Sequence, residues 1–154
     1  MRSILLSLAL LLLASIPTHA SAVDPFRASI PCALMASDGG GLTYFGPAKA
    51  VGVDRVLRTH LAIPEGECIS YVEVSGSTTA PGGPVGAYVY LLRSGAVVTI
   101  GKTTIPEGKS GTYKTTFTPV CAREGDIFWS VVTLNAGGGV PYEAASCSYV
   151  SVGE

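Results

Sequence analysis

The stretch VLRTHLAIPEGECISYVEVS, residues 56–75, decides the fold class. In its first half, the apolar residues Leu57 and Leu61 alternate with the polar residues Arg58 and His60. Alternation with a period of two gives a β-strand one apolar face and one wetter face. The second half, ISYVEVS, is rich in Val, Ile and Tyr, which favour strands. The stretch therefore predicts two strands joined by a tight turn.

The turn between these two strands has the sequence IPEG, residues 63–66. Proline at the second position and glycine at the fourth are typical of a type I turn. The same four residues recur at 105–108, and each copy is followed five residues later by a tyrosine, Tyr71 or Tyr113. Nothing else aligns across this interval. We interpret the recurrence as one turn used twice rather than as an internal duplication.

The same pattern of strand-favouring segments separated by turn residues continues along the chain. Gly and Pro recur about every ten residues, and the segments between them are rich in Val, Ile, Thr and Tyr, which is typical of an all-β domain. No segment beyond the N-terminus has a helical face. Strands are expected at 30–35, 56–63, 69–75, 85–93, 96–103, 112–118, 127–134 and 145–152. About eight strands suit a two-sheet antiparallel β-sandwich of the jelly-roll type.

One segment, IFWSVVTL at residues 127–134, is largely apolar at both odd and even positions. A strand with two apolar faces is usually buried on both sides. We therefore predict that this strand is central in its sheet and covered on both faces.

Four cysteines are spaced widely along the chain: Cys32, Cys68, Cys121 and Cys147. In an exported chain they indicate two disulfides, and the absence of CxxC spacing disfavours a zinc site. Three connectivities are possible. In a jelly roll, one sheet would hold the first, eighth, third and sixth strands in that order. This order places Cys32 beside Cys147 and Cys68 beside Cys121, which is the connectivity we prefer.

The N-terminus resembles a secretory signal peptide. Arg2 precedes an apolar run that is too short to span a bilayer as a helix, and Ala20-Ser21-Ala22 offers a cleavage site of small residues. We expect residues 1–22 to be removed, with cleavage after Ala20 as the alternative. Residues 23–154 then form one domain, secreted or periplasmic, with no membrane span after cleavage.

The charge pattern disfavours two partner classes. Residues 23–154 keep nine of the ten basic residues and all eleven acidic ones, a formal charge of −2 without any basic run, so nucleic acid is not expected as a partner. The segment GAVVTIGKTT, residues 95–104, resembles a phosphate-binding loop. It has five residues instead of four between its glycines, and Pro106 follows where a helix must begin. No cofactor is expected.

The catalytic residue types are sparse. His60 is the single histidine after the signal peptide, and no GxSxG motif is present, so no catalytic or metal-binding residue is assigned. A small secreted hydrolase using paired carboxylates is the alternative function. Calcium held by Asp38, Asp54 or Glu143 has no supporting motif spacing. The candidate acids are Asp38, Asp54, Glu65, Glu67, Glu73, Glu107, Glu124, Asp126 and Glu143. Glu73 alone lies inside an apolar strand, where we expect it on the outward face.

Tyrosines suggest a binding surface. Tyr88 and Tyr90 lie two residues apart in one predicted strand and therefore share a face. A tyrosine ring has an apolar face and a polar tip, which suits stacking on a sugar or packing against a cell-surface protein. The alternative is that these tyrosine side chains cover the edges of the hydrophobic core, and it applies also to Tyr71, Tyr142 and Tyr149.

The segments 61–77, 85–94 and 127–135, together with the closing SYVSV, resemble small exported bacterial β-sandwich domains of unassigned function. The resemblance rests on turn-and-strand patterns, and it departs from them at Glu67 and Cys68, where a small residue is usual. It implies the fold and brings no functional residues. Together with the residue pattern, it predicts a disulfide-braced binding, surface-associated or structural module rather than an enzyme.

Overall fold

The computed structural model describes residues 24–37, 48–51, 54–79, 83–135 and 144–154, and these residues form an all-β fold. The predicted signal peptide lies outside the described residues. In chain order the elements are β1 (Arg27–Pro31), a 3-10 helix η1 (Cys32–Leu34), β2 (Ala36–Ser37), β3 (Ala48–Val51), β4 (Arg55–Leu61), β5 (Cys68–Thr78), β6 (Val85–Arg93), β7 (Ala96–Ile105), β8 (Ser110–Cys121), β9 (Ile127–Leu134) and β10 (Ala144–Gly153).

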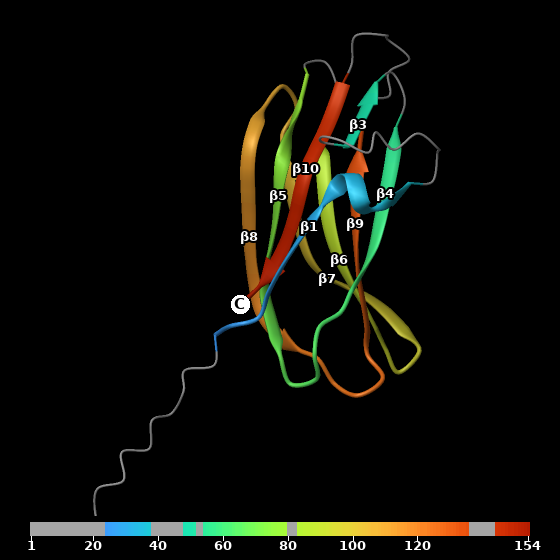
Figure 1. The fold of residues 1–154 in the computed structure, drawn as a ribbon, viewed down its shortest axis with the longest axis vertical. Helices are drawn as coiled ribbons and strands as arrows, with labels where there is room; N and C mark the ends of the chain where they lie inside the picture. The colour runs from blue at the N-terminus through green and yellow to red at the C-terminus, as the bar shows by residue number, and fades with distance from the viewer. Residues whose placement is uncertain (1–23, 38–47, 52–53, 80–82, 136–143) are drawn as a thin grey trace, which may run out of the picture.

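The strands form two antiparallel sheets packed face to face (Figure 1). Sheet A has the order β1-β10-β5-β8, with β3 also pairing with β10. Sheet B has the order β2-β4-β9-β6-β7. The order of sheet A is the one that the jelly-roll topology predicts, so the predicted fold class is confirmed.

The first predicted strand, residues 30–35, is wrong in extent. The structure ends β1 at Pro31, and Cys32 lies in η1, where Met35 donates its backbone N–H to the Cys32 carbonyl. Proline fits the end of a strand because it has no N–H to donate to a ladder. The short helix carries the chain from sheet A, which contains β1, to sheet B, which contains β2.

The two IPEG turns are shifted by one residue from the prediction. The Glu67 N–H donates to the Pro64 carbonyl, and the Lys109 N–H donates to the Pro106 carbonyl. Glycine is therefore third in each turn, with φ of +85° at Gly66 and +67° at Gly108. A positive φ at the third position is the geometry of a type II turn, which favours glycine there. The prediction of a type I turn was wrong for this reason.

The core lies between the sheets and is filled from both. Val72, Val74 and Val150 of sheet A face Val89, Phe128 and Val132 of sheet B, and all six are buried. These residues follow the period-two alternation of their strands.

Both disulfides brace sheet A. Cys32 bonds to Cys147 in β10, and Cys68 in β5 bonds to Cys121, its cross-strand partner in β8. This is the connectivity expected from the strand order. Two disulfides fit a protein exported to an oxidising compartment.

Candidate functional site

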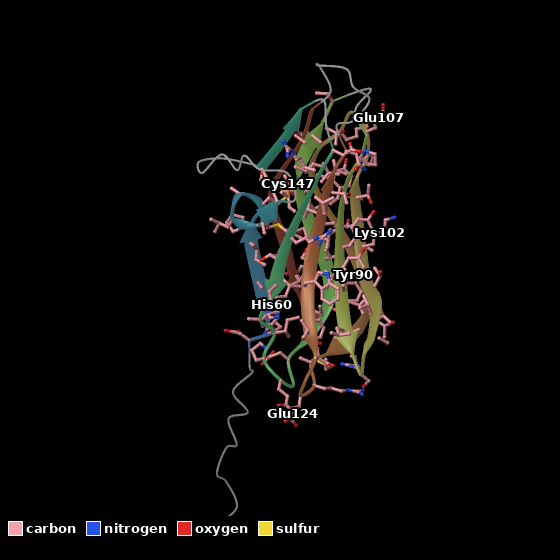
Figure 2. All side chains as sticks on the ribbon, turned by 90° about the vertical axis from the view of Figure 1, so that its right-hand side faces the viewer. His60, Tyr90, Lys102, Glu107, Glu124 and Cys147 are labelled. Carbon is pink, nitrogen blue, oxygen red and sulfur yellow. A yellow bond between two sulfur atoms is a disulfide. The ribbon has the colours of Figure 1, made fainter. Side chains whose placement is uncertain are left out.

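The outer face of sheet B is the candidate site, and strand alternation determines which side chains it presents. In β6, Val85, Ala87, Val89 and Leu91 are buried in the core. The intervening positions of β6 therefore point outward, and Tyr88 and Tyr90 are among them. Figure 2 looks toward this side of the molecule, with Tyr90 lying between His60 and Lys102.

Three aromatic side chains lie next to one another on this face. The ring centroids of Tyr88 and Tyr90 are 6.3 Å apart, with 24° between the ring planes. Trp129 in β9 is the cross-strand partner of Tyr90, and their centroids are 5.5 Å apart with 16° between the planes. All three side chains are partly exposed. We call Tyr88, Tyr90 and Trp129 the aromatic strip.

A glycine positions one end of the aromatic strip. A Cβ placed on Gly86 would lie 2.8 Å from the Cε2 atom of Tyr88 and 2.8 Å from Oγ1 of Thr133. The Tyr88 ring thus occupies the space that a side chain at Gly86 would fill. This close packing against Gly86 fixes where the Tyr88 ring lies.

An aliphatic row extends the apolar surface toward the tip of the β6–β7 hairpin. Leu92 pairs with Ile127 on one side and with Val97 on the other. The side chains of Ile127 and Val97 are 43% and 59% exposed, respectively, which is unusual for large apolar residues. We call these three residues the aliphatic row. Together with the aromatic strip it forms one continuous apolar surface across β9, β6 and β7.

Basic side chains flank the aromatic strip. Lys102 in β7 pairs with Tyr88, and its Nζ lies 5.4 Å from the centre of the Tyr88 ring. Arg58 and His60 in β4 are exposed and pair with Val131 and Trp129 of β9, respectively. On the strands of sheet B that the structure describes, no outward position carries Asp or Glu. The face is therefore apolar in its middle and basic at both sides.

The structure brings together Tyr88 and Tyr90, the pair predicted from the sequence, and adds Trp129, which the sequence analysis missed. The prediction that residues 127–134 form a central strand is confirmed, since β9 lies between β4 and β6. The prediction that both faces of this strand are covered is wrong, because Trp129 is partly exposed and Ile127 is exposed. Phe128 and Trp129 are both aromatic, so composition alone did not show which of them faces the core. Phe128 and Ser130 are both buried and therefore face the core, which turns Trp129 outward, but the burial of Ser130 is known only from the structure.

The outer face of sheet A is different in character. The Tyr149 hydroxyl donates to Oε1 of Glu73 at 3.3 Å, and Nζ of Lys114 lies 3.7 Å from the centre of the Tyr71 ring. Lys114 is also the cross-strand partner of Glu73. The polar groups on this face therefore contact one another. Tyr142 lies outside the described residues.

The predicted alternative, a hydrolase, needs two carboxylates facing one cleft. Among the described acids, Glu124 and Asp126 line one hollow, where Arg93 binds the Asp126 carboxylate. Glu73 is on the outward face as predicted, and its described cross-strand partners are Ser151 and Lys114 rather than a second acid. Asp38 and Glu143 lie outside the described residues. Among the residues that the structure describes, no group of three or more His, Cys, Asp or Glu side chains is arranged to hold a metal ion. In the same residues, no helix is long and apolar enough to cross a membrane.

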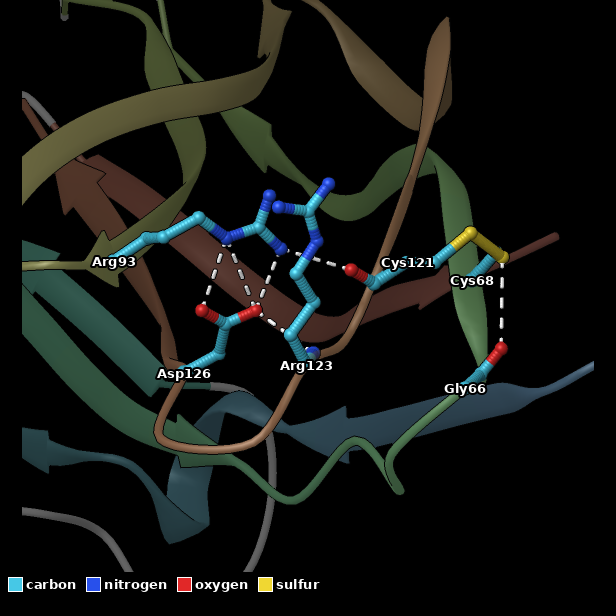
Figure 3. Close-up of a disulfide and its surroundings, with 6 residues drawn as sticks. All are labelled: Gly66, Cys68, Arg93, Cys121, Arg123 and Asp126. Carbon is cyan, nitrogen blue, oxygen red and sulfur yellow. Dashed lines mark hydrogen bonds and ion pairs between the residues drawn. A yellow bond between two sulfur atoms is a disulfide. The ribbon is translucent and has the colours of Figure 1, made fainter.

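Arg93 links the two sheets at one end of the sandwich, where it forms an ion pair with Asp126 and a hydrogen bond to Cys121 of sheet A (Figure 3). Nη2 of Arg93 in β6 donates to Oδ2 of Asp126 at 2.6 Å and to the Cys121 carbonyl at 2.9 Å. The Asp126 side chain is only 3% exposed, and it also accepts the Arg123 backbone N–H. The hydrogen bonds from Arg93 hold the pKa of Asp126 below its ordinary value. A hollow of about 340 Å³ beside this pair is lined by Ser94, Arg123 and Glu124.

Comparison with known proteins shows the fold. No protein-family model and no curated protein matches the chain. Among solved structures it is similar to the CBM36-1 domain of a multidomain xylanase from the hindgut metagenome of Trinervitermes trinervoides, with a TM-score of 0.50 and 14% identity over 84% of this chain and 98% of that one.

Two further solved structures are less similar. One is chitosan-binding module 1 of a chitosanase/glucanase from Paenibacillus sp. IK-5, with a TM-score of 0.41 and 17% identity over 84% of this chain and 96% of that one. The other is the isomalto-dextranase of Arthrobacter globiformis T6, with a TM-score of 0.46 and 11% identity over 82% of this chain but 23% of that one. The predicted resemblance to jelly-roll-like β-sandwich domains is confirmed at the level of the fold.

Proposed function

We propose that this protein is an exported, non-catalytic module that binds a polysaccharide on the outer face of sheet B. The observation that carries the proposal is the aromatic strip, Tyr88, Tyr90 and Trp129, whose rings are near-parallel, adjacent and partly exposed. Each ring offers apolar area for the C–H face of a sugar and a polar tip for a hydroxyl group. Soluble proteins seldom leave such contiguous apolar area uncovered without a binding role.

The strip is built on rigid elements. Its residues lie on β6 and β9, each of which is paired with a strand on both sides in sheet B. Rings held on central strands are fixed before the ligand arrives, so little conformational entropy is lost on binding. A preformed flat surface of this kind suits an extended chain of sugars better than a small molecule, which is usually held in a concave pocket.

The proposal also includes export of the protein from the cytoplasm. The two disulfides fit an oxidising compartment, and we propose that residues 1–22 direct the chain there as a signal peptide. A polysaccharide outside the cytoplasm or in a cell envelope would then be accessible to the domain.

The test is affinity electrophoresis of the disulfide-intact, exported protein through gels that contain xylan, dextran or polygalacturonate. Xylan is the first neutral probe because the structurally similar CBM36-1 domain belongs to a xylanase. We expect retardation by at least one polysaccharide, abolished in Trp129→Ala. Tyr149→Ala removes an aromatic ring from the outer face of sheet A and is the matched control, which should migrate like the unchanged protein. Retardation that is equal in both variants, or absent with every polysaccharide, would contradict the proposal.

A further inference from the structure

We propose that the polysaccharide is anionic, bearing carboxylate or sulfate groups, and that Lys102 and Arg58 contact those groups on either side of the aromatic strip. This inference rests on the proposed function and names the chemical class of its ligand.

The two basic residues lie in one row across the sheet. Arg58 in β4 pairs with Val131 in β9, Val131 pairs with Tyr88 in β6, and Tyr88 pairs with Lys102 in β7. Neighbouring strands are about 4.8 Å apart, so the Cα atoms of Arg58 and Lys102 are separated by roughly 14 Å. Both side chains are exposed. A sugar chain covering Tyr88 would therefore have a cation within reach on each side.

In the part of the chain that the structure describes, Lys102 lies beside an aromatic ring and no acidic side chain forms an ion pair with it. Its Nζ lies over the Tyr88 ring. Lys114 on sheet A is a useful contrast, because its cross-strand partner is Glu73. The chain as a whole carries more acidic than basic residues, yet the described outward positions of sheet B hold none of the acidic ones. Arg58 and Lys102 therefore place positive charge on the face that carries the aromatic strip, with no acidic side chain at its described outward positions.

This arrangement favours an anionic ligand over a neutral one. A neutral sugar chain that covered Tyr88 would remove water from the Lys102 ammonium group without offering it a counter-charge, and such desolvation is unfavourable. A carboxylate or sulfate in the same place would accept a charge-assisted hydrogen bond. Acidic side chains on this face would repel such a ligand, and their absence from the described positions is what charge complementarity requires.

Two matched pairs of polymers test the inference. Polygalacturonate and its methyl ester differ in carboxylate charge, and dextran sulfate and dextran differ in sulfate charge. We expect the charged member of at least one pair to bind more tightly, by about fivefold, since one exposed ion pair contributes up to about fivefold in affinity. The preference should shrink as NaCl is raised from 50 to 500 mM, because salt screens exposed charges. The pair that shows the preference identifies the carboxylate or the sulfate as the group recognised.

Variants separate the inference from the proposed function. Lys102→Gln should reduce the preference for the charged polymer, because Arg58 remains, and should keep binding that depends on Trp129, whereas the matched variant Lys114→Gln on sheet A should keep the full preference. Equal binding of both members of each pair would overturn the inference and leave the proposed function standing. Equal loss in Lys102→Gln and Lys114→Gln would also overturn it, because binding would then follow overall charge. No binding to any of these polymers or to xylan would overturn both the inference and the proposed function.

Discussion

The two outer faces of this sandwich have the same architecture and opposite chemistry. On sheet A, Glu73 accepts from Tyr149 and pairs across the strands with Lys114, and both disulfides brace this sheet. On sheet B, the aromatic strip is partly exposed and Nζ of Lys102 lies over the Tyr88 ring. A face whose polar groups contact one another has little left to offer a ligand. This difference is the basis of our proposal that sheet B binds the polysaccharide, whereas sheet A stabilises the domain.

The largest expected effect concerns the brace on sheet A. Replacing Cys68 and Cys121 together by Ala removes a cross-link between residues separated by 53 positions, which lowers the free energy of unfolding by on the order of 4 kcal/mol in the chain-entropy model. Urea unfolding measures this change. Polysaccharide affinity, measured in the absence of urea on the fraction that remains folded, should be unchanged. A loss of affinity with stability intact would reverse the roles that we assign to the two sheets.

The second prediction concerns the strip itself. Trp129→Ala should weaken polysaccharide binding by about 2 kcal/mol, roughly thirtyfold, because buried aromatic anchors dominate binding energy. Trp129 is partly exposed in the free protein, so the midpoint of thermal unfolding should change little. Isothermal titration calorimetry and a thermal melt of the same sample measure both quantities. Tyr149→Ala is again the control, and an equal loss of affinity there would remove the distinction between the faces.

A pair of glycines gives a smaller and sharper test. A Cβ on Gly86 in β6 would meet the flexible end of Tyr88, whereas a Cβ on Gly76 in β5 would meet the backbone carbonyl of Ser146. Gly86→Ala should therefore displace the Tyr88 ring and lower affinity severalfold with little loss of stability. Gly76→Ala should lower the free energy of unfolding by about 1 kcal/mol or more and leave affinity unchanged. Chemical denaturation and titration of both variants would show whether the two effects separate in this way.

The smallest expected effect is at the ion pair between Arg93 and Asp126. Because the folded-state pKa of Asp126 is lowered below the unfolded value of about 3.9, its stabilising contribution is present above that pH and is lost as the pH falls through the folded-state pKa. Asp126→Asn should be less stable than the unchanged protein at pH 7, and the difference should shrink between pH 5 and pH 2. Denaturant midpoints over this range measure it. A difference that stays constant with pH would show that the carboxylate charge contributes nothing.

The strand order of sheet A could be predicted from the sequence because the turns, the strand count and the cysteines all agreed with one topology. The alternation of Leu57 and Leu61 with Arg58 and His60 marks β4 clearly, and β4 is observed at Arg55–Leu61. The short strands β2 and β3 were not predicted. Two to four residues carry no periodicity, and their pairing is decided by neighbours distant in sequence.

The site was predicted only in part, for a physical reason. Tyr88 and Tyr90 alternate with small buried residues, so their shared face follows from the sequence. Trp129 follows Phe128, and either residue is apolar enough for the core. Only the pairing of β9 with β4 and β6 places Phe128 between the sheets and Trp129 beside Tyr90. The positions of Arg58 and Lys102 on either side of the aromatic strip could not be predicted at all, because the two residues are aligned only through three strand pairings.

The most direct test of the account uses the fluorescence of Trp129, which is the single tryptophan in the chain. The protein is titrated with a polysaccharide that retards it in gels, while the emission maximum and the accessibility of Trp129 to acrylamide are followed. If the sugar chain covers the aromatic strip, the emission will shift to shorter wavelength and quenching will fall, both saturating at the ligand concentration given by calorimetry. Saturable binding by calorimetry with unchanged emission and quenching would place the ligand elsewhere and contradict the central claim.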